Sequence, residues 1–219
     1  MRFERYAVYW LPGGPLGSAG AAWLGWDARA GRGWGLEAPA RYGFHATMRP
    51  PFAPPRGARE AEIAEAFEAV AATLRPADLG RLRVDDLGGF LALRPEREEG
   101  ARAMASALVE GLDALRSPPL PEAVARRRAA GLTPAQDALL ERWGYPFVME
   151  EHRLHLTLSG RNPAPGTKAA AEAHFGALLE RGWTIRGLSL VGEDGLGRFH
   201  LVHDAPCGAS AESALVTAS

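Results

Sequence analysis

Two short stretches, FHATM at residues 44–48 and LHLTL at residues 154–158, decide how this chain is interpreted. Each places a histidine two residues before a threonine inside an apolar run, and the two histidines lie 110 positions apart. Successive side chains of a strand point to opposite faces, so each histidine and its threonine are expected to share a face, with the apolar residues facing the core. Two such motifs in matching contexts predict a site built from two halves.

The segments around the two motifs repeat the same order of elements. Each half, about 42–95 and about 152–204, reads as motif strand, helix, strand, turn and strand. Apolar residues at helical spacing predict the two helices over 59–75 and 167–181. We interpret this order as an internal duplication with pseudo-two-fold symmetry in one α+β protein. If the two motif strands are neighbours, their polar side chains line one cleft.

Further segments complete a single domain expected over residues 1–205. Apolar spacing predicts a helix over 97–116, and residues 121–143 read as a helical hairpin inserted between the halves. Thr133, followed by proline and by Gln136 at the capping-box position, marks the start of its second helix. Residues 206–219 are small and polar, and we expect them to form a disordered tail.

Composition restricts the class of protein. Of 219 residues, 47% are apolar and 23% charged, as in globular proteins, and no apolar run approaches the roughly 18 residues that span a bilayer. The first residues lack the pattern of a signal peptide. Cys207 is the single cysteine, which excludes a disulfide framework and favours the cytoplasm. A net charge of −1 argues against a long duplex-binding groove.

The paired histidines, His45 and His155, suit general acid–base catalysis. The ordinary pKa of histidine is about 6.5, so near neutrality one ring can accept a proton while the other donates one. The hydroxyls of Thr47 and Thr157 could donate hydrogen bonds to the oxygens of a central phosphate. Because imidazoles and hydroxyls already handle protons and charge, we expect neither a metal nor another cofactor.

Four residues beside the motifs are candidates for substrate binding: Tyr42, Arg49, Tyr145 and Arg153. An arginine can grip a phosphate with two parallel hydrogen bonds, and a tyrosine ring can lie against a sugar or base. Strand alternation would place both arginines in the polar rows of the motifs, although Pro50 follows Arg49 and could turn the chain. Alternatively, the tyrosines simply close the core.

Other polar residues are weaker candidates for a functional site. The remaining histidines, which are His152, His174, His200 and His203, lack the carboxylate partners and spacing expected of a zinc site. The stretch ARRR at residues 125–128 reads as the solvated face of a helix, or as a group that guides an anionic substrate.

The motifs HAT at residues 45–47 and HLT at residues 155–157 resemble the two signatures of the two-histidine (2H) phosphoesterase superfamily. RYGFHATMRPPF and HLTLSGR are more narrowly similar to a branch of that superfamily described as phosphonate-metabolism proteins of unknown substrate. The resemblance implies a bilobal fold with two antiparallel sheets around a central cleft. It also implies that the two histidines are acid and base and that the two threonines are phosphate ligands.

The sequence therefore predicts a cytoplasmic cyclic phosphodiesterase acting on a small nucleotide or a phosphorylated sugar, in the context of phosphonate metabolism. Two alternatives remain open at this point. One is an RNA 2′,3′-cyclic phosphodiesterase or another RNA-end processing enzyme, which would need a basic track beyond the site. The other is a non-catalytic module that binds a phosphorylated ligand. No membrane partner is expected, and the sequence does not decide the oligomeric state.

Overall fold

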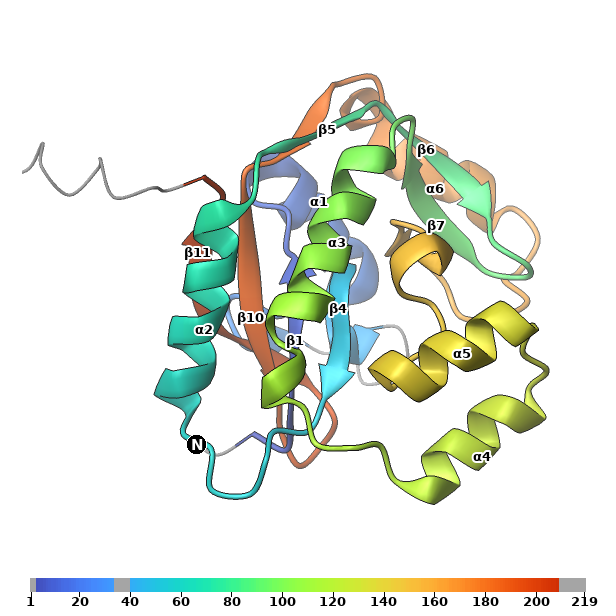
Figure 1. The fold of residues 1–219 in the computed structure, drawn as a ribbon. Helices are drawn as coiled ribbons and strands as arrows, with labels where there is room; N and C mark the ends of the chain where they lie inside the picture. Colours follow the sequence, from blue (N-terminus) through green and yellow to red (C-terminus); the bar gives the residue numbers. More distant parts are fainter. Residues whose placement is uncertain (1–2, 34–39, 209–219) are drawn as a thin grey trace, which may run out of the picture.

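The centre of the protein is a seven-stranded sheet in which every neighbouring pair is antiparallel (Figure 1). The structure is a computed structural model that describes residues 3–33 and 40–208. In spatial order the strands are β11 (Phe199–Pro206), β10 (Gly187–Glu193), β1 (Arg5–Trp10), β4 (Ala46–Phe52), β8 (Leu156–Thr157), β7 (Leu91–Pro95) and β6 (Leu82–Asp86). Two short two-stranded ladders join β5 (Ala77–Gly80) to β9 (Trp183–Ile185) and β2 (Trp26–Asp27) to β3 (Arg32–Gly33).

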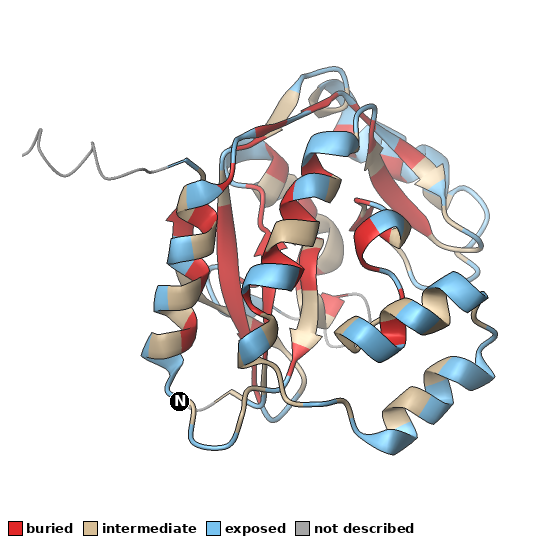
Figure 2. Ribbon diagram, viewed as in Figure 1, coloured by how far each residue is buried: buried red, intermediate tan, exposed pale blue. Residues whose placement is uncertain are grey.

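In the described part of the chain, six helices surround this sheet, and all but α4 contain buried residues. Their bounds are α1 (Gly14–Leu24), α2 (Glu60–Thr73), α3 (Glu99–Gly111), α4 (Pro121–Ala129), α5 (Pro134–Trp143) and α6 (Thr167–Phe175). On α2, the residues Ile63, Phe67 and Ala71 recur every four positions and are fully buried. Helix α2 contacts β10 and β11 at one side of the sheet, and α3 contacts the central strand β4. Both helices show buried and exposed residues in alternation (Figure 2). Short 3₁₀ turns at Ala40–Tyr42, Asp113–Leu115, Met149–Glu151 and Gly176–Leu178 complete the elements.

The internal duplication is visible in the order of elements. The first half runs β4, α2, β5, β6, β7, and the second runs β8, α6, β9, β10, β11. Strands β5 and β9 pair with each other, as expected for elements near a two-fold axis. Each half also places its final hairpin on the other side: β6–β7 lies beside β8, and β10–β11 lies on the side of β1 and β4. The α+β class with antiparallel sheets is confirmed, and the two expected sheets join through β4 and β8.

The helix predictions are confirmed with shorter bounds. Helix α2 lies within the predicted 59–75, and α3 within 97–116, where the chain leaves the α conformation at Leu112. The predicted hairpin at 121–143 is α4 and α5, and Thr133 caps α5 by accepting a hydrogen bond from the backbone N–H of Gln136 at 3.2 Å. Helix α6 ends at Phe175, before a 3₁₀ turn, so the predicted helix at 167–181 is too long.

At the C-terminal end, the structure extends further than the predicted domain boundary. Strand β11 continues to Pro206, and the backbone N–H of Cys207 donates to the carbonyl of Arg186 at 2.8 Å. Residues 206–208 therefore belong to the ordered fold rather than to the predicted tail. The rest of that tail, residues 209–219, lies outside the described residues.

Candidate active site

The two His-x-Thr motifs meet where β4 pairs with β8. Ala46 and Leu156 are antiparallel partners, and both are fully buried. Each histidine stands one residue before the strand that the motif predicts, since β4 begins at Ala46 and β8 at Leu156. By this register His45 lies across from Thr157 and Thr47 across from His155, and these four side chains are all partly exposed on the opposite face from the core pair. The expected alternation is thus present.

A cavity of about 670 Å³, the histidine cavity, opens over this face. His45, Thr47 and Thr157 line it, together with the predicted residues Tyr42 and Tyr145. Phe90 also lines the cavity, whereas His155 does not. The ring centroids of His155 and Phe90 are 5.8 Å apart. His155 is also close enough to His45 to lower the pKa of His45. The structure therefore brings both histidines to one place.

Both histidines are oriented by the same local hydrogen bond. The Nδ1–H of His45 donates to the carbonyl of Gly43 at 3.0 Å, and the Nδ1–H of His155 donates to the carbonyl of Arg153 at 2.7 Å. In each case the acceptor is the residue two positions earlier. Because a carbonyl only accepts, Nδ1 carries the proton and Nε2 of the neutral ring keeps its lone pair. The Nε2 of His45 lies 3.2 Å from the Thr47 hydroxyl.

Aromatic packing surrounds His45. Its ring stacks on that of Tyr9 with centroids 4.0 Å apart, and Tyr42 lies at 6.1 Å. The pKa of His45 is lowered to about 4, chiefly by burial; the hydrogen bond to Gly43 opposes this shift, and the nearby His155 adds a smaller lowering. His45 is therefore neutral at physiological pH, which is the protonation state of a general base.

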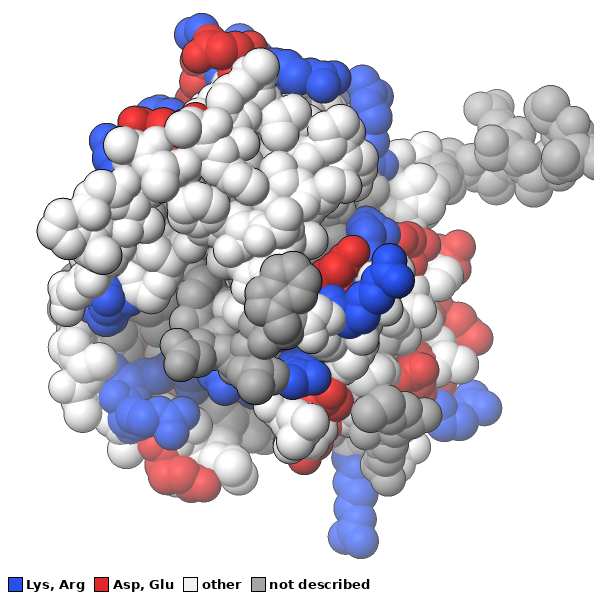
Figure 3. All heavy atoms as spheres, turned by 180° about the vertical axis from the view of Figure 1, so that it is seen from behind, with Lys and Arg blue, Asp and Glu red and all other residues white. Residues whose placement is uncertain are grey.

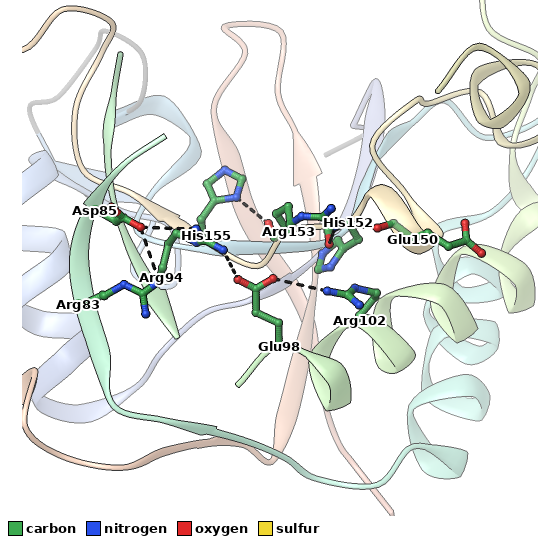
Figure 4. A network of polar contacts seen from close by, with 9 residues as sticks. All are labelled: Arg83, Asp85, Arg94, Glu98, Arg102, Glu150, His152, Arg153 and His155. Atoms are coloured by element: carbon green, nitrogen blue, oxygen red, sulfur yellow. Dashed lines mark hydrogen bonds and ion pairs between the residues drawn. The ribbon is translucent and has the colours of Figure 1, made fainter. Parts of the chain in front are cut away.

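Polar contacts surround the second motif. An ion-pair network links β6, β7 and α3 beside it: Arg94 contacts Asp85 at 3.4 Å and Glu98 at 2.6 Å, and Arg102 contacts Glu98 at 3.7 Å (Figure 4). His152 is buried nearby, and burial lowers its pKa.

His152 also ties the two motifs together. Its Nε2–H donates to the carbonyl of Thr47 at 2.9 Å, so the segment that precedes β8 is held directly against β4. This contact supplements a strand pairing that is short, since β8 has only two residues. The sequence offers no signal for this role beyond the polarity of His152 before an apolar strand.

Arg49 does not lie in the polar row that alternation predicts. The pairing of β1 with β4 matches Tyr9 with Thr47 but Val8 with Arg49, so β4 contains one extra residue at this bulge. A β-bulge reverses the facing of the residues that follow it. Arg49 is consequently only 2% exposed and does not line the histidine cavity.

The buried guanidinium of Arg49 instead completes the end of α3. It donates to the carbonyls of Leu108, Val109 and Leu112 at 3.4, 2.9 and 3.1 Å, and it packs 4.3 Å above the ring of Phe52. The carbonyls of Leu108 and Leu112 also accept from the backbone N–H groups of Leu112 and Leu115, so Arg49 adds a second donor there. A cation is favoured at this negative end of the helix dipole. The predicted substrate ligand therefore has a structural role in the protein.

Arg153 also lies away from the cavity lining. Its side chain is exposed and donates to the carbonyls of Glu150 and His152, at the end of the turn Met149–Glu151. The tyrosines fit the prediction better, because Tyr42 and Tyr145 both line the cavity. Burial raises the pKa of Tyr145, which keeps its hydroxyl protonated.

Several cavity residues were not singled out as site residues from the sequence. Tyr9 and Arg5 come from β1, a strand that is hydrophobic along most of its length. Phe90 precedes β7, and Arg127 lies on α4 within the ARRR stretch at residues 125–128. Ser159, Gly160 and Arg161 directly follow the second motif and also line the cavity. Proximity to a motif could have indicated these three; only the fold brings the others to the site.

Among residues 3–33 and 40–208, no group of three or more His, Cys, Asp or Glu side chains is arranged to hold a metal ion. Over the same residues, none of the helices combines the length and apolar character needed to cross a bilayer.

The chain is similar to a described protein family and to curated proteins. A family model described as "Protein of unknown function (DUF1045)" matches residues 47–200. The chain belongs to this family. Two curated relatives are named ribose 1,5-bisphosphate phosphokinase PhnN. The one from Laribacter hongkongensis (strain HLHK9) is 38% identical over 220 residues, and the one from Janthinobacterium sp. (strain Marseille) is 36% identical over 201.

The curated relatives are much longer than the matched region. The alignments cover 88% and 80% of this chain but 49% and 44% of those proteins, so the chain spans about half the length of these relatives.

Among solved structures, TT0787 of Thermus thermophilus aligns over 93% of this chain and 98% of its own, with a TM-score of 0.51 and 16% identity. This match shows a shared fold. A crystal structure described as a phosphoesterase aligns over 94% of this chain and 99% of its own, with a TM-score of 0.45 and 14% identity.

Proposed function

We propose that this member of the family is a phosphoesterase that hydrolyses a cyclic phosphodiester. The observation that carries the proposal is the matched pair of histidines. Each donates Nδ1–H to the carbonyl two residues earlier, so Nε2 of each neutral ring carries no proton, on the face where the motifs meet. The resemblance of HAT and HLT to the signatures of the 2H phosphoesterases supports the same reaction.

The surroundings of the two histidines support a division of roles. His45, with its pKa lowered to about 4, acts as the general base and takes a proton from the attacking water. His155 acts as the general acid and protonates the departing sugar oxygen. The water oxygen forms a bond to phosphorus while the bond from phosphorus to the sugar oxygen breaks, and the product is a phosphomonoester.

The threonines hold the phosphate between the two rings. Thr47 and Thr157 both line the cavity, each across the strand pair from the other motif's histidine. Their hydroxyls donate to the non-bridging oxygens, where negative charge develops in the transition state. Each such donor contributes roughly 3–4 kcal/mol in mutational tests on other enzymes.

A small phosphorylated sugar fits the site better than an RNA strand. A cavity of about 670 Å³ is of the size that encloses a small molecule. On the face drawn in Figure 3, the described Lys and Arg side chains form separate groups with Asp and Glu beside several of them, rather than a stripe that could follow a nucleic-acid backbone. The name of the curated relatives, which refers to a ribose bisphosphate, favours a phosphorylated ribose, in keeping with a place in phosphonate metabolism.

The test is turnover of ribose cyclic phosphates. The protein is incubated with a nucleoside 2′,3′-cyclic phosphate and with a ribosyl 1,2-cyclic phosphate, and phosphorus NMR follows conversion of the cyclic diester to a monoester. We expect the wild type to hydrolyse at least one of the two compounds, and we expect His45→Ala and His155→Ala to lose this activity. Failure of the wild type to hydrolyse either compound, or full activity of both variants, would refute the proposal.

A further inference from the structure

The histidine cavity is larger than one phosphate requires, and part of its lining is shared with a second cavity. Arg5, Pro50, Pro51, Arg127 and Tyr145 line both this cavity and a neighbouring one of about 420 Å³. None of the four His-x-Thr residues lines the neighbouring cavity. The two arginines therefore stand at the border between the cavities, away from the region where the motifs meet.

Arg127 differs from the arginines beside it on α4. Arg126 and Arg128 are exposed, and Arg128 forms an ion pair with Asp137 at 2.6 Å. Arg127 is half-buried, and its guanidinium carbon lies 5.2 Å from the ring centroid of Tyr145. No carboxylate of the described residues lies within ion-pair distance of Arg127, whose one hydrogen bond there is a 3.5 Å contact with the carbonyl of Ala123.

A second cation reinforces this position. Arg5 lies near enough to Arg127 to lower its pKa, in addition to the effects of burial and of Arg126. Arg5 is held in place by Glu193, which accepts hydrogen bonds from both its Nε and its Nη2. A half-buried guanidinium without a carboxylate, beside another cation, is electrostatically unfavourable until an anion binds. An arginine also binds phosphate through two parallel hydrogen bonds.

We propose that Arg127, supported by Arg5, binds a second phosphate group of the substrate, separate from the phosphodiester held between the histidines. The inference rests on the proposed function and narrows it to one substrate class: a cyclic phosphodiester of a sugar that also carries a phosphate monoester at a distant position. Tyr145, between the neighbouring cavity and the histidine cavity, would lie beside the sugar that joins the two phosphates.

The test measures binding without catalysis. Isothermal titration calorimetry compares the affinities for ribose 1-phosphate and ribose 1,5-bisphosphate in the wild type, in Arg127→Gln and in Arg126→Gln. A charge-assisted contact of about 1.4 kcal/mol corresponds to a tenfold change in Kd. We therefore expect the wild type to bind the bisphosphate roughly tenfold more tightly, and this ratio to fall close to one in Arg127→Gln.

Arg126→Gln is the matched control, because it removes the same charge from the adjacent position of the same helix; Arg126 lines the neighbouring cavity but not the histidine cavity. We expect it to keep the wild-type ratio. Equal affinities for the two sugars in the wild type, no binding of either at millimolar concentration, or the same loss in both variants would overturn the inference.

Turnover of cyclic phosphates separates this inference from the proposed function. Hydrolysis without any preference for the bisphosphate would overturn the second phosphate site and leave the phosphoesterase proposal in place. A preference that depends on Arg127, without hydrolysis of any ribose cyclic phosphate, would support the site and overturn the enzyme.

Discussion

The two His-x-Thr motifs share a backbone design but differ in their surroundings. The first opens a strand of seven residues, and its histidine stacks on Tyr9 at 4.0 Å. The second opens a strand of two residues, held by neighbours on both sides and by the hydrogen bond from His152 to Thr47. A network of ion pairs that includes Arg94 and Glu98 lies beside it.

In the proposed mechanism, this difference gives the two halves of a duplicated site separate roles. The repeated hydrogen bond to the carbonyl two residues earlier orients both imidazoles in the same way. The neighbours of His45 then decide its protonation state. A ring packed among aromatic side chains loses the stabilisation that water gives to its charged form, so its pKa falls and it stays in the neutral form that can accept a proton. Substitutions in the two motifs and around them can break this division or sharpen it.

Removal of either histidine is expected to cause the greatest loss. His45→Ala and His155→Ala should each lower kcat for a cyclic phosphate by roughly 10³-fold, within the range of 10²–10⁴ for general acid–base catalysis. The double variant should be little worse than either single variant, because the two rings act as a unit. His174→Ala, at an exposed ring that contacts the carbonyl of Ala19, is the control in steady-state assays. Retention of activity within tenfold by one variant would end the paired mechanism.

The two arginines near the motifs should differ in their effect on stability. Arg49→Met removes a buried donor from three carbonyls at the end of α3, and we expect the free energy of unfolding to fall by about 3 kcal/mol. Arg153→Met changes an exposed side chain and should cost less than about 0.5 kcal/mol. Urea unfolding followed by circular dichroism measures both. Similar losses in the two variants would contradict the structural role of Arg49.

The threonines should show a smaller effect on catalysis. Thr47→Val and Thr157→Val keep the shape of the side chain but remove the hydroxyl, and we expect kcat to fall by roughly 10²-fold in each. Thr47→Val should be the more severe, because this hydroxyl also contacts the Nε2 of His45 at 3.2 Å. Thr47→Ser and Thr157→Ser restore the donor and should recover most of the activity. Unchanged kcat in both valine variants would exclude the threonines as phosphate ligands.

The smallest effect concerns pH. Because His45 has a pKa of about 4, its neutral form persists to low pH, and kcat/KM should decline only as the pH falls through about 4. Tyr9→Leu admits water beside the ring, so the pKa should rise toward 6.5 and move this acid limb upward by about one unit.

Phe90→Leu, beside His155, is the matched control and should leave the acid limb in place. An acid limb near pH 6.5 in the wild type would show that His45 is not the base.

Much of this architecture follows from local sequence pattern. Periodicity located α2 and α3, and the capping box at Thr133 located the start of α5, because these signals depend on residues three or four positions apart. Strand alternation likewise indicated that His45 and Thr47 share a face. Tertiary arrangement was needed elsewhere. A bulge in β4, which depends on pairing with β1, turned Arg49 into the core against the simple alternation.

The sequence by itself determined the duplicated order of elements, the two motifs and the residues they contain, since all of these are encoded in spacing along one chain. Only the tertiary structure decided that β4 and β8 are neighbours, that Tyr9 stacks on His45, and that Arg127 reaches the same cavity from an inserted helix. The reason is physical: burial, pKa and the shape of a cavity depend on groups distant in the chain, and no local pattern records which of them will meet.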